Sequence, residues 1–278
     1  LSDVDIEAVA TRKETYTAGS RKPEVAAGDL YDDVHRRDFT VNSLLKDLTS
    51  GEVLDLTGLG KDDIQKGVVR TALDPDVIFT EDPLRILRAV RFAMKYGWQL
   101  PSNMLRSMRK NANQIKNISH ERIRDELDKM LMTGSPQRAI KLLKAVKILD
   151  LIIPEFKDAY GMTQNMHHKH TVFAHSLEVL SKTKPVLVQR LMGLFHDIGK
   201  GRKKDHHIIG ENIFKKTMKN FGFDDEFIKM GANIIRYHDQ MSRTATNEDI
   251  YSQKAILNFI GLFKNINELK ILYVVTYC

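Results

Sequence analysis

The sequence is poor in cysteine and in long apolar runs. Its only cysteine among 278 residues is Cys278, which excludes an internal disulfide framework and a cysteine-rich zinc site. No segment approaches the roughly 20 apolar residues that a bilayer-spanning helix needs, and the N-terminus lacks the pattern of a secretory signal. These absences predict a protein without membrane segments that works in a reducing compartment such as the cytoplasm.

Positive charge exceeds negative charge along the chain. The 43 lysines and arginines outnumber the 36 aspartates and glutamates, so the formal net charge is +7. A basic balance of this size suits a nucleic-acid partner without proving one. The length allows two or three domains, each with its own core.

The hydrophobic pattern changes near residue 75. Before it, alternation predicts short strands at residues 4–9 and 52–56, and residues 42–45 resemble the start of a helix. From Asp74 onward the apolar spacing is helical, and no strand signal of similar strength returns. Asp74 followed by Pro75, and later Ser119, predict helix N-termini. The expected fold class is mainly α, with a small α/β part at the beginning.

Two charged strings stand out. Residues 36–42 read Arg-Arg-Asp-Phe-Thr-Val-Asn, and residues 81–88 read Glu-Asp-Pro-Leu-Arg-Ile-Leu-Arg. Fixed charges beside apolar residues are costly unless a polyanionic or hydrogen-bonding ligand joins them. In the second string a spacing of three would align Asp82 with three arginines on one helical face. The alternative is that both strings form solvated helix faces held by weak ion pairs.

Together the two strings resemble the class II tRNA nucleotidyltransferases, the family of CCA-adding enzymes and bacterial poly(A) polymerases. The resemblance implies a site that selects CTP and ATP through protein side chains. Its implied nucleotide-binding residues are Arg36, Arg37, Asp38 and Asn42 for the triphosphate and sugar, Asp82 and Arg85 for the edge of the base, and Arg88 and Arg91 for further phosphate contacts.

Transfer in this family uses carboxylates that hold Mg²⁺, because metal ions neutralise charge on the attacking and leaving oxygens. The resemblance makes Glu7 the third of these carboxylates and places the Asp-x-Asp pair further upstream. Asp3 and Asp5 could instead be that pair, or could be solvated strand residues. Residues 55–64 resemble the flexible element of the family, although Thr57 and Leu59 depart from its pattern.

A second group of residues is rich in histidine: His175, His196 next to Asp197, His206 next to His207, and His238. An adjacent His-Asp pair flanked by apolar residues must bury two polar side chains, which a divalent metal would satisfy. Imidazole together with carboxylate suits ions such as Mn²⁺, Ni²⁺, Co²⁺ or Fe²⁺.

These residues resemble the HD phosphohydrolase superfamily. The resemblance implies His175, His196 and Asp197 as primary metal ligands, and His206 and His238 as ligands of a second metal, with His207 the alternative to His206. A distal aspartate of the superfamily would follow Cys278. Lys200 would be a phosphate-binding cation. The histidines at 167, 168 and 170, which precede a helix start, would be surface residues or would support the ligands without binding the metal.

The sequence thus predicts the end of a nucleotidyltransferase palm at residues 1–75, a helical neck at 76–148 and a helical HD domain at 149–278. Both ends look interrupted, so we expect a piece of a longer protein that is inactive in transfer on its own. The implied function is untemplated addition of CMP and AMP to the 3′ end of tRNA, with phosphate-ester hydrolysis by the HD domain. The alternatives are a poly(A) polymerase, a stand-alone HD phosphohydrolase or cyclic phosphodiesterase, and an RNA-binding module.

Overall fold

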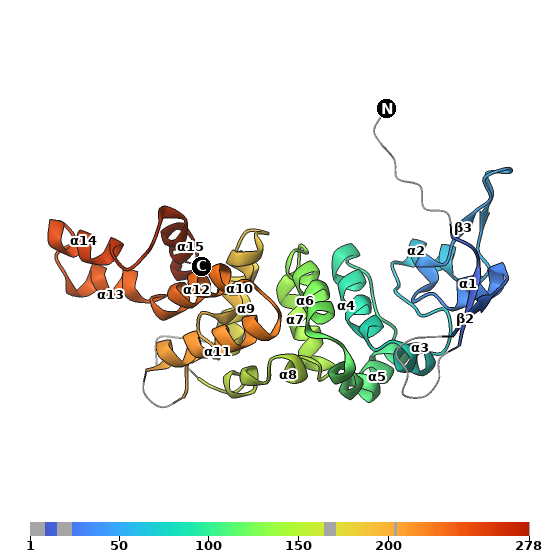
Figure 1. Ribbon diagram of the computed structural model, residues 1–278, viewed down its shortest axis with the longest axis horizontal. Coiled ribbons are helices and arrows are strands. Elements are labelled where there is room, and N and C mark those ends of the chain that lie inside the picture. The colour runs from blue at the N-terminus through green and yellow to red at the C-terminus, as the bar shows by residue number, and fades with distance from the viewer. Residues whose placement is uncertain (1–8, 16–23, 164–170, 203–204, 278) are drawn as a thin grey trace. The chain divides into compact units, whose positions relative to one another are not determined.

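The computed structural model describes residues 9–15, 24–163, 171–202 and 205–277 (Figure 1). The chain forms two compact units, residues 1–114 and residues 115–278. Short strands occur in the first unit, and the described part of the second consists of helices and their connections. The expected fold class, mainly α with a small α/β part at the beginning, is confirmed.

The described part of the first unit combines small antiparallel strand pairs with α-helices and a short 3₁₀ helix. Strand β1 pairs with β2, and β3 pairs with β4, with Leu45 opposite Leu54. The elements are β1 (Arg12–Thr15), β2 (Glu24–Ala27), α1 (Leu30–His35), η1 (Thr40–Asn42), β3 (Leu45–Lys46), β4 (Val53–Leu54), α2 (Gly60–Lys66), α3 (Pro75–Glu81), α4 (Leu84–Tyr96) and α5 (Ser102–Asn111).

The strand expected at residues 52–56 is confirmed as β4, and the one expected at residues 4–9 falls almost entirely outside the described residues. The helix start expected at residues 42–45 is wrong. A single 3₁₀ turn ends at Asn42, and the chain then extends into β3. The hydroxyl of Ser43 donates to the carbonyls of Val34 (3.2 Å) and Phe39 (2.9 Å). This local bonding closes a turn and competes with continuation of a helix.

Capping residues define the helices that carry the second charged string. The carboxylate of Asp74 accepts a hydrogen bond from the amide of Asp76 (2.7 Å), and Pro75 occupies the first turn of α3 as predicted. Helix α4 ends at Gly97, whose φ of 70° lies in the left-handed region that glycine tolerates. The side chain of Phe39 is fully buried and meets Phe92 of α4 edge to face, with 5.5 Å between ring centroids.

The 3₁₀ helix η2 (Ala112–Asn117) links the units. The second unit contains α6 (His120–Leu131), α7 (Pro136–Ala145), α8 (Leu149–Ile152), η3 (Pro154–Ala159), α9 (Val172–Lys182), α10 (Leu187–Phe195), α11 (His206–Asn220), α12 (Asp225–Arg236), α13 (Gln240–Asn247), α14 (Gln253–Ile260) and α15 (Ile266–Tyr277). Helix α6 starts behind Ser119, as predicted.

The core of the second unit places the histidine-rich segments. Helix α9 packs against α10, and α11 against α12. The buried ring of Phe195, at the end of α10, contacts Phe156 and Phe214, with centroid distances of 5.5 and 5.6 Å. Helix α10 therefore ends against the core just before His196 and Asp197. Among the described residues, no helix combines the length and the apolar character needed to cross a membrane.

Candidate functional site

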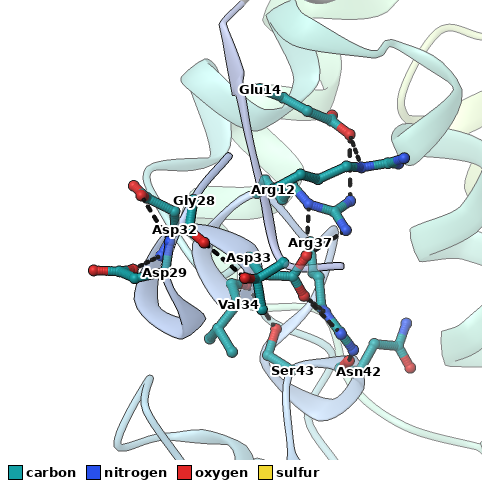
Figure 2. A network of polar contacts seen from close by, with 12 residues as sticks. Arg12, Glu14, Gly28, Asp29, Asp32, Asp33, Val34, Arg37, Asn42 and Ser43 are labelled. Atoms are coloured by element: carbon teal, nitrogen blue, oxygen red, sulfur yellow. Dashed lines mark hydrogen bonds and ion pairs between the residues drawn. The ribbon is translucent and has the colours of Figure 1, made fainter. Parts of the chain in front are cut away.

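The first charged string follows α1, and its arginines gather on one acidic residue of that helix. Asp33 accepts hydrogen bonds from Nη2 of Arg36 (2.5 Å) and from Nη2 of Arg37 (2.8 Å). Burial alone would raise the pKa of Asp33, but the hydrogen bonds and charges of the two arginines outweigh it, and the pKa lies below its ordinary value. Figure 2 shows Asp33 and Arg37 in this network.

The carboxylate of Asp38 joins the first string to helix α4. Its Oδ1 accepts hydrogen bonds from the amide of Phe39 and from Nδ2 of Asn42, both at 2.9 Å. Its Oδ2 lies 2.6 Å from Nε of Arg88. Two residues of the first string and one of the second thus meet at a carboxylate that is only 8 % exposed.

Arg85 makes a second connection between the strings. Its Nη2 donates to the carbonyl oxygen of Arg36 (2.8 Å), and its Nη1 donates to Oε2 of Glu81 (3.0 Å). Burial is the main reason that the pKa of Glu81 is raised, and the charge of Glu14 adds to it, while Arg85 opposes it. Arg85 is itself 8 % exposed. A buried guanidinium between a carboxylate and a carbonyl has a fixed orientation, as recognition of a base edge requires.

The other two residues of the second string lie differently from the predicted helical face. Asp82 has an extended backbone at the end of α3, and its Oδ1 accepts a hydrogen bond from the amide of Leu84 (3.1 Å) at the start of α4. The predicted single face is therefore wrong for Asp82, because the break between α3 and α4 leaves only the arginines on the helix. The guanidinium of Arg91 lies 4.6 Å from the ring centroid of Phe92.

The segment expected to be a flexible element is closely bonded. Asp55 accepts hydrogen bonds from the hydroxyl of Thr57 (2.7 Å) and from the amide of Lys61 (2.9 Å). Asp63 is 1 % exposed and accepts a hydrogen bond from the hydroxyl of Thr40 (2.7 Å), within the first charged string. The segment is thus tied directly to the first charged string.

His175, His196 and Asp197 form one cluster in the second unit. Their candidate ligand atoms all lie within 4.8 Å of one another. Nε2 of His196 is 3.4 Å and Nε2 of His175 is 3.7 Å from Oδ2 of Asp197. The same oxygen lies 2.8 Å from Nζ of Lys200. Helix α9, which carries His175, and the end of α10, which is followed by His196 and Asp197, therefore bring together the residues expected to be the primary ligands.

His206, His207 and His238 form the second cluster, with ligand atoms again within 4.8 Å of one another. Both candidates at the start of α11 thus lie near His238. Burial lowers the pKa of His206 and, in spite of the charge of Asp239, lowers that of His207 to about 4. Neutral imidazole is the form that binds metal.

Asp197 belongs to the first cluster and also contacts His238 of the second. Its Oδ1 lies 3.1 Å from Nε2 of His238, yet it is buried and accepts no hydrogen bond from the described residues. Nδ1 of His238 contacts the carbonyl of Ile235 (2.8 Å), and Nδ1 of His196 contacts that of Gly193 (3.0 Å). In the neutral tautomer that donates to these carbonyls, each Nε2 presents a lone pair toward the carboxylate. The donor set therefore fits a divalent cation.

Burial alone would raise the pKa of Asp197, but the neighbouring histidines outweigh it and hold the pKa well below its ordinary range. The carboxylate is thus ionised, as a metal ligand must be.

Some predicted residues are outside the described part of the chain, namely Asp3, Asp5, Glu7, His167, His168 and His170. Conversely, sequence reasoning gave no role to Asp33, Glu14 or Glu81. Asp33 precedes Arg36 and Arg37 by three and four positions, the spacing of neighbours on a helix, so this signal was available. Glu14 lies on strand β1, far from α1 in the sequence, so sequence spacing alone does not predict its contact with Arg36.

Family profiles match three consecutive segments of the chain. Residues 1–70 match the poly(A) polymerase head domain, residues 97–160 match the "probable RNA and SrmB-binding site of polymerase A", and residues 172–258 match the HD domain. Nucleotidyltransferase and HD domains generally use divalent metals, and this chain has candidate metal-binding groups.

Two curated relatives and one solved structure illustrate the similarity. The chain is 31 % identical over 224 residues to the multifunctional CCA protein of Neisseria gonorrhoeae, covering 75 % of this chain and 53 % of the relative. It is 28 % identical over 232 residues to a bifunctional uridylyltransferase/uridylyl-removing enzyme of Cereibacter sphaeroides, covering 74 % of this chain and 25 % of the relative.

The chain therefore spans between a quarter and about half of the length of these relatives. The fold of a CCA-adding enzyme in its apo form II superposes with a TM-score of 0.65 at 17 % identity, covering 97 % of this chain and 60 % of that one. With the head, RNA-binding and HD profiles in one order along the sequence, the chain belongs to the tRNA nucleotidyltransferase and poly(A) polymerase family and carries an HD domain.

Proposed function

We propose that the chain takes part in the untemplated addition of CMP and AMP to the 3′ end of tRNA, with CTP and ATP as donors. The observation that carries this proposal is the meeting of the two charged strings. Arg88 pairs with Asp38, and Arg85 donates to the carbonyl of Arg36. The helix expected to read the base is thereby fixed against the loop expected to hold the triphosphate, which is the arrangement that template-free selection needs.

The proposed roles divide the site by chemistry. Guanidinium groups of Arg36 and Arg37 bind phosphate oxygens, with Asp38 and Asn42 near the sugar. Asp82 accepts and Arg85 donates at the edge of cytosine or adenine, and each good pair of this kind discriminates by about 1–3 kcal/mol. Arg88 and Arg91 add positive charge for phosphate.

Phosphoryl transfer gains most of its rate from positioning and from charge stabilisation. Arginines held by carboxylates keep the triphosphate in one orientation while the terminal hydroxyl of tRNA, losing its proton, attacks the α-phosphate. The bond between the α- and β-phosphates breaks, and pyrophosphate leaves. Glu7 is the proposed carboxylate ligand of Mg²⁺, and bound Mg²⁺ supplies neutralisation of the attacking and leaving oxygens. We place the reaction in the cytoplasm, the compartment that suits a chain with a single cysteine.

The histidine clusters favour a second candidate activity, hydrolysis of phosphate esters by the HD domain. His175, His196 and Asp197 are the proposed ligands of one ion such as Mn²⁺, Ni²⁺ or Co²⁺, and His206 and His238 of another, with His207 the alternative to His206. Lys200, 2.8 Å from Asp197, would contribute a positive charge for the phosphate. A role of this domain as a tRNA-binding body remains the alternative.

Nucleotide selection is tested first by binding, with each of the four nucleoside triphosphates titrated separately. Tighter binding of CTP and ATP than of GTP and UTP is expected, and equal binding of all four would contradict the proposed site. Incorporation is then measured with the intact enzyme on tRNA lacking its last three nucleotides, with each triphosphate alone. Long tails made from ATP alone would identify a poly(A) polymerase instead.

The HD activity is tested with a phosphate monoester and a 2′,3′-cyclic phosphate in the presence of Mn²⁺, Ni²⁺ or Co²⁺. Hydrolysis that His196→Ala abolishes, while CTP binding is kept, would support two separate sites. Hydrolysis without nucleotide binding by the unmodified chain would favour a stand-alone HD hydrolase. Salt-sensitive tRNA binding without either activity would favour an RNA-binding module.

A further inference from the structure

Asp33 connects the two arginines of the first charged string through both of its oxygens. Oδ1 accepts hydrogen bonds from Nε and Nη2 of Arg36, at 3.0 and 2.5 Å. Oδ2 accepts from Nε and Nη2 of Arg37, at 3.2 and 2.8 Å. One carboxylate therefore holds the same edge of two adjacent guanidinium groups, and Figure 2 shows Asp33 and Arg37 in this network.

The position of Asp33 is enforced by burial. Its side chain is 8 % exposed, and a buried carboxylate is tolerated only when it is paired and hydrogen-bonded. Its pKa lies below the ordinary value, because the arginine hydrogen bonds overcome the effect of burial. The carboxylate stays ionised at neutral pH, so both arginines are held by a permanent charge.

The side chains of Arg36 and Arg37 remain partly exposed to solvent. Their side chains are 21 % exposed at Arg36 and 33 % at Arg37. Nη1 of Arg36 lies 3.3 Å from Oε1 of Glu14, and Nη1 of Arg37 donates to the carbonyl of Asn42 (2.9 Å). Each guanidinium carries five N–H groups, and these contacts engage three of them. As far as contacts with the described residues go, donors therefore remain on both arginines while their planes are fixed.

We propose that Asp33 is a positioning residue, which orients Arg36 and Arg37 for the phosphate chain of the bound nucleotide. Two neighbouring guanidinium groups repel each other and have many side-chain conformations. A shared counter-charge reduces the repulsion and removes those conformations before the ligand arrives. This inference rests on the proposed nucleotide site but concerns a residue that does not itself touch the nucleotide.

The test compares Asp33→Asn and Asp33→Glu with the unmodified chain. Asp32→Asn is the matched control, since Asp32 precedes Asp33 on α1, is only half-buried, and contacts the amide of Asp29 and Lys13 and not the two arginines. Calorimetric titrations measure the affinity for CTP, for CMP and for inorganic tripolyphosphate, and circular dichroism melting measures folding. CMP lacks the outer phosphates, and tripolyphosphate lacks the base and the sugar.

The expected result for Asp33→Asn is a loss of about tenfold or more in affinity for CTP and tripolyphosphate, the size of a lost charge-assisted interaction. Affinity for CMP should change by less than about threefold. Asp33→Glu should restore part of the loss because it keeps the charge, and Asp32→Asn should bind as the unmodified chain does.

Three outcomes would overturn the inference. Equal losses for CTP and CMP would show a general structural role, and tighter tripolyphosphate binding by Asp33→Asn would show that Asp33 competes with phosphate. Unchanged binding would show that the arginines need no anchor. Failure of the proposed function gives a different result. In that case the unmodified chain would bind tripolyphosphate but would not bind CTP more tightly than GTP or UTP. The effect of Asp33→Asn on tripolyphosphate binding would still decide the inference. If the unmodified chain bound neither CTP nor tripolyphosphate, the proposed function and this inference would both be overturned.

Discussion

Nε of Arg88 lies 2.6 Å from Oδ2 of Asp38, although fifty positions separate the two residues in the sequence. The other oxygen of Asp38 accepts hydrogen bonds from the amide of Phe39 and from the side chain of Asn42. One buried carboxylate thus fixes the turn after α1. Through Arg88 it also fixes the position of that turn relative to α4. Charge in this site therefore serves local folding as well as the proposed ligand binding.

A double-mutant cycle with Asp38→Ala and Arg88→Ala should reveal this coupling in urea unfolding. We expect a coupling free energy of about 1 kcal/mol, because the charged hydrogen bond is partly screened by solvent at Arg88. Asp62 and Lys66 are an exposed ion pair on α2 at 2.8 Å and provide the control cycle, for which about 0.3–0.5 kcal/mol is expected. A value for the Asp38 cycle no larger than the control would show that the pair does not join the strings.

Arg85→Lys should weaken both folding and nucleotide selection. A lysine ammonium is a point charge without the planar fork, so it cannot donate to Glu81 and to the carbonyl of Arg36 in the same geometry. We expect the free energy of unfolding to fall by about 1–2 kcal/mol and the preference for CTP over UTP to decrease. Arg138→Lys, at an exposed position of α7, is the control. Unchanged selectivity would remove Arg85 from base recognition.

Much of the fold follows from the sequence where the signals are local. The proline after Asp74 and the serine at position 119 mark helix starts because capping depends on neighbouring residues. The helix expected at residues 42–45 failed because its alternative is partly non-local: Ser43 bonds back to Val34, and Leu45 pairs with Leu54. Sequence periodicity carries no information about such partners.

The site residues show the same division. His196 and Asp197 are adjacent, so their proximity needed no structure, but the approach of His238 to Asp197 depends on how α12 packs. Glu14 reaches Arg36 from β1 across 22 positions. The residue types proposed to bind phosphate and metal were thus predictable. The contact of Glu14 with Arg36 was found only in the structure, whereas the spacing of Asp33 from the two arginines was visible in the sequence.

Asp128 should make the second unit less stable at high pH. Burial raises its pKa to about 6 despite Arg124, and its Oδ1 accepts no hydrogen bond among the described residues. Because the folded pKa exceeds the unfolded value, the stabilisation from protonation is fully present below about pH 4 and is lost as pH rises through about 6.

Asp128→Asn should therefore raise the free energy of unfolding by about 1–2 kcal/mol at pH 8 relative to the unmodified chain, with little difference near pH 4. Urea titrations at the two pH values measure this, and Asp225→Asn, in the exposed first turn of α12, is the control. A loss of stability at pH 8 would show instead that the ionised Asp128 is paired with Arg124.

Divalent metal should raise the melting temperature of the chain through the two histidine clusters, because a ligand that binds only the folded state stabilises it. Asp197 lies within reach of both clusters, so Asp197→Asn should remove most of the shift caused by Mn²⁺ or Ni²⁺. His207→Gln should weaken only part of the binding, since His175 and His196 remain. Bound metal is counted by elemental analysis after gel filtration, with the exposed His120→Gln as the control. If Asp197→Asn bound as much metal as the control, Asp197 would not be a ligand. The clusters would then bind metal through their histidines alone.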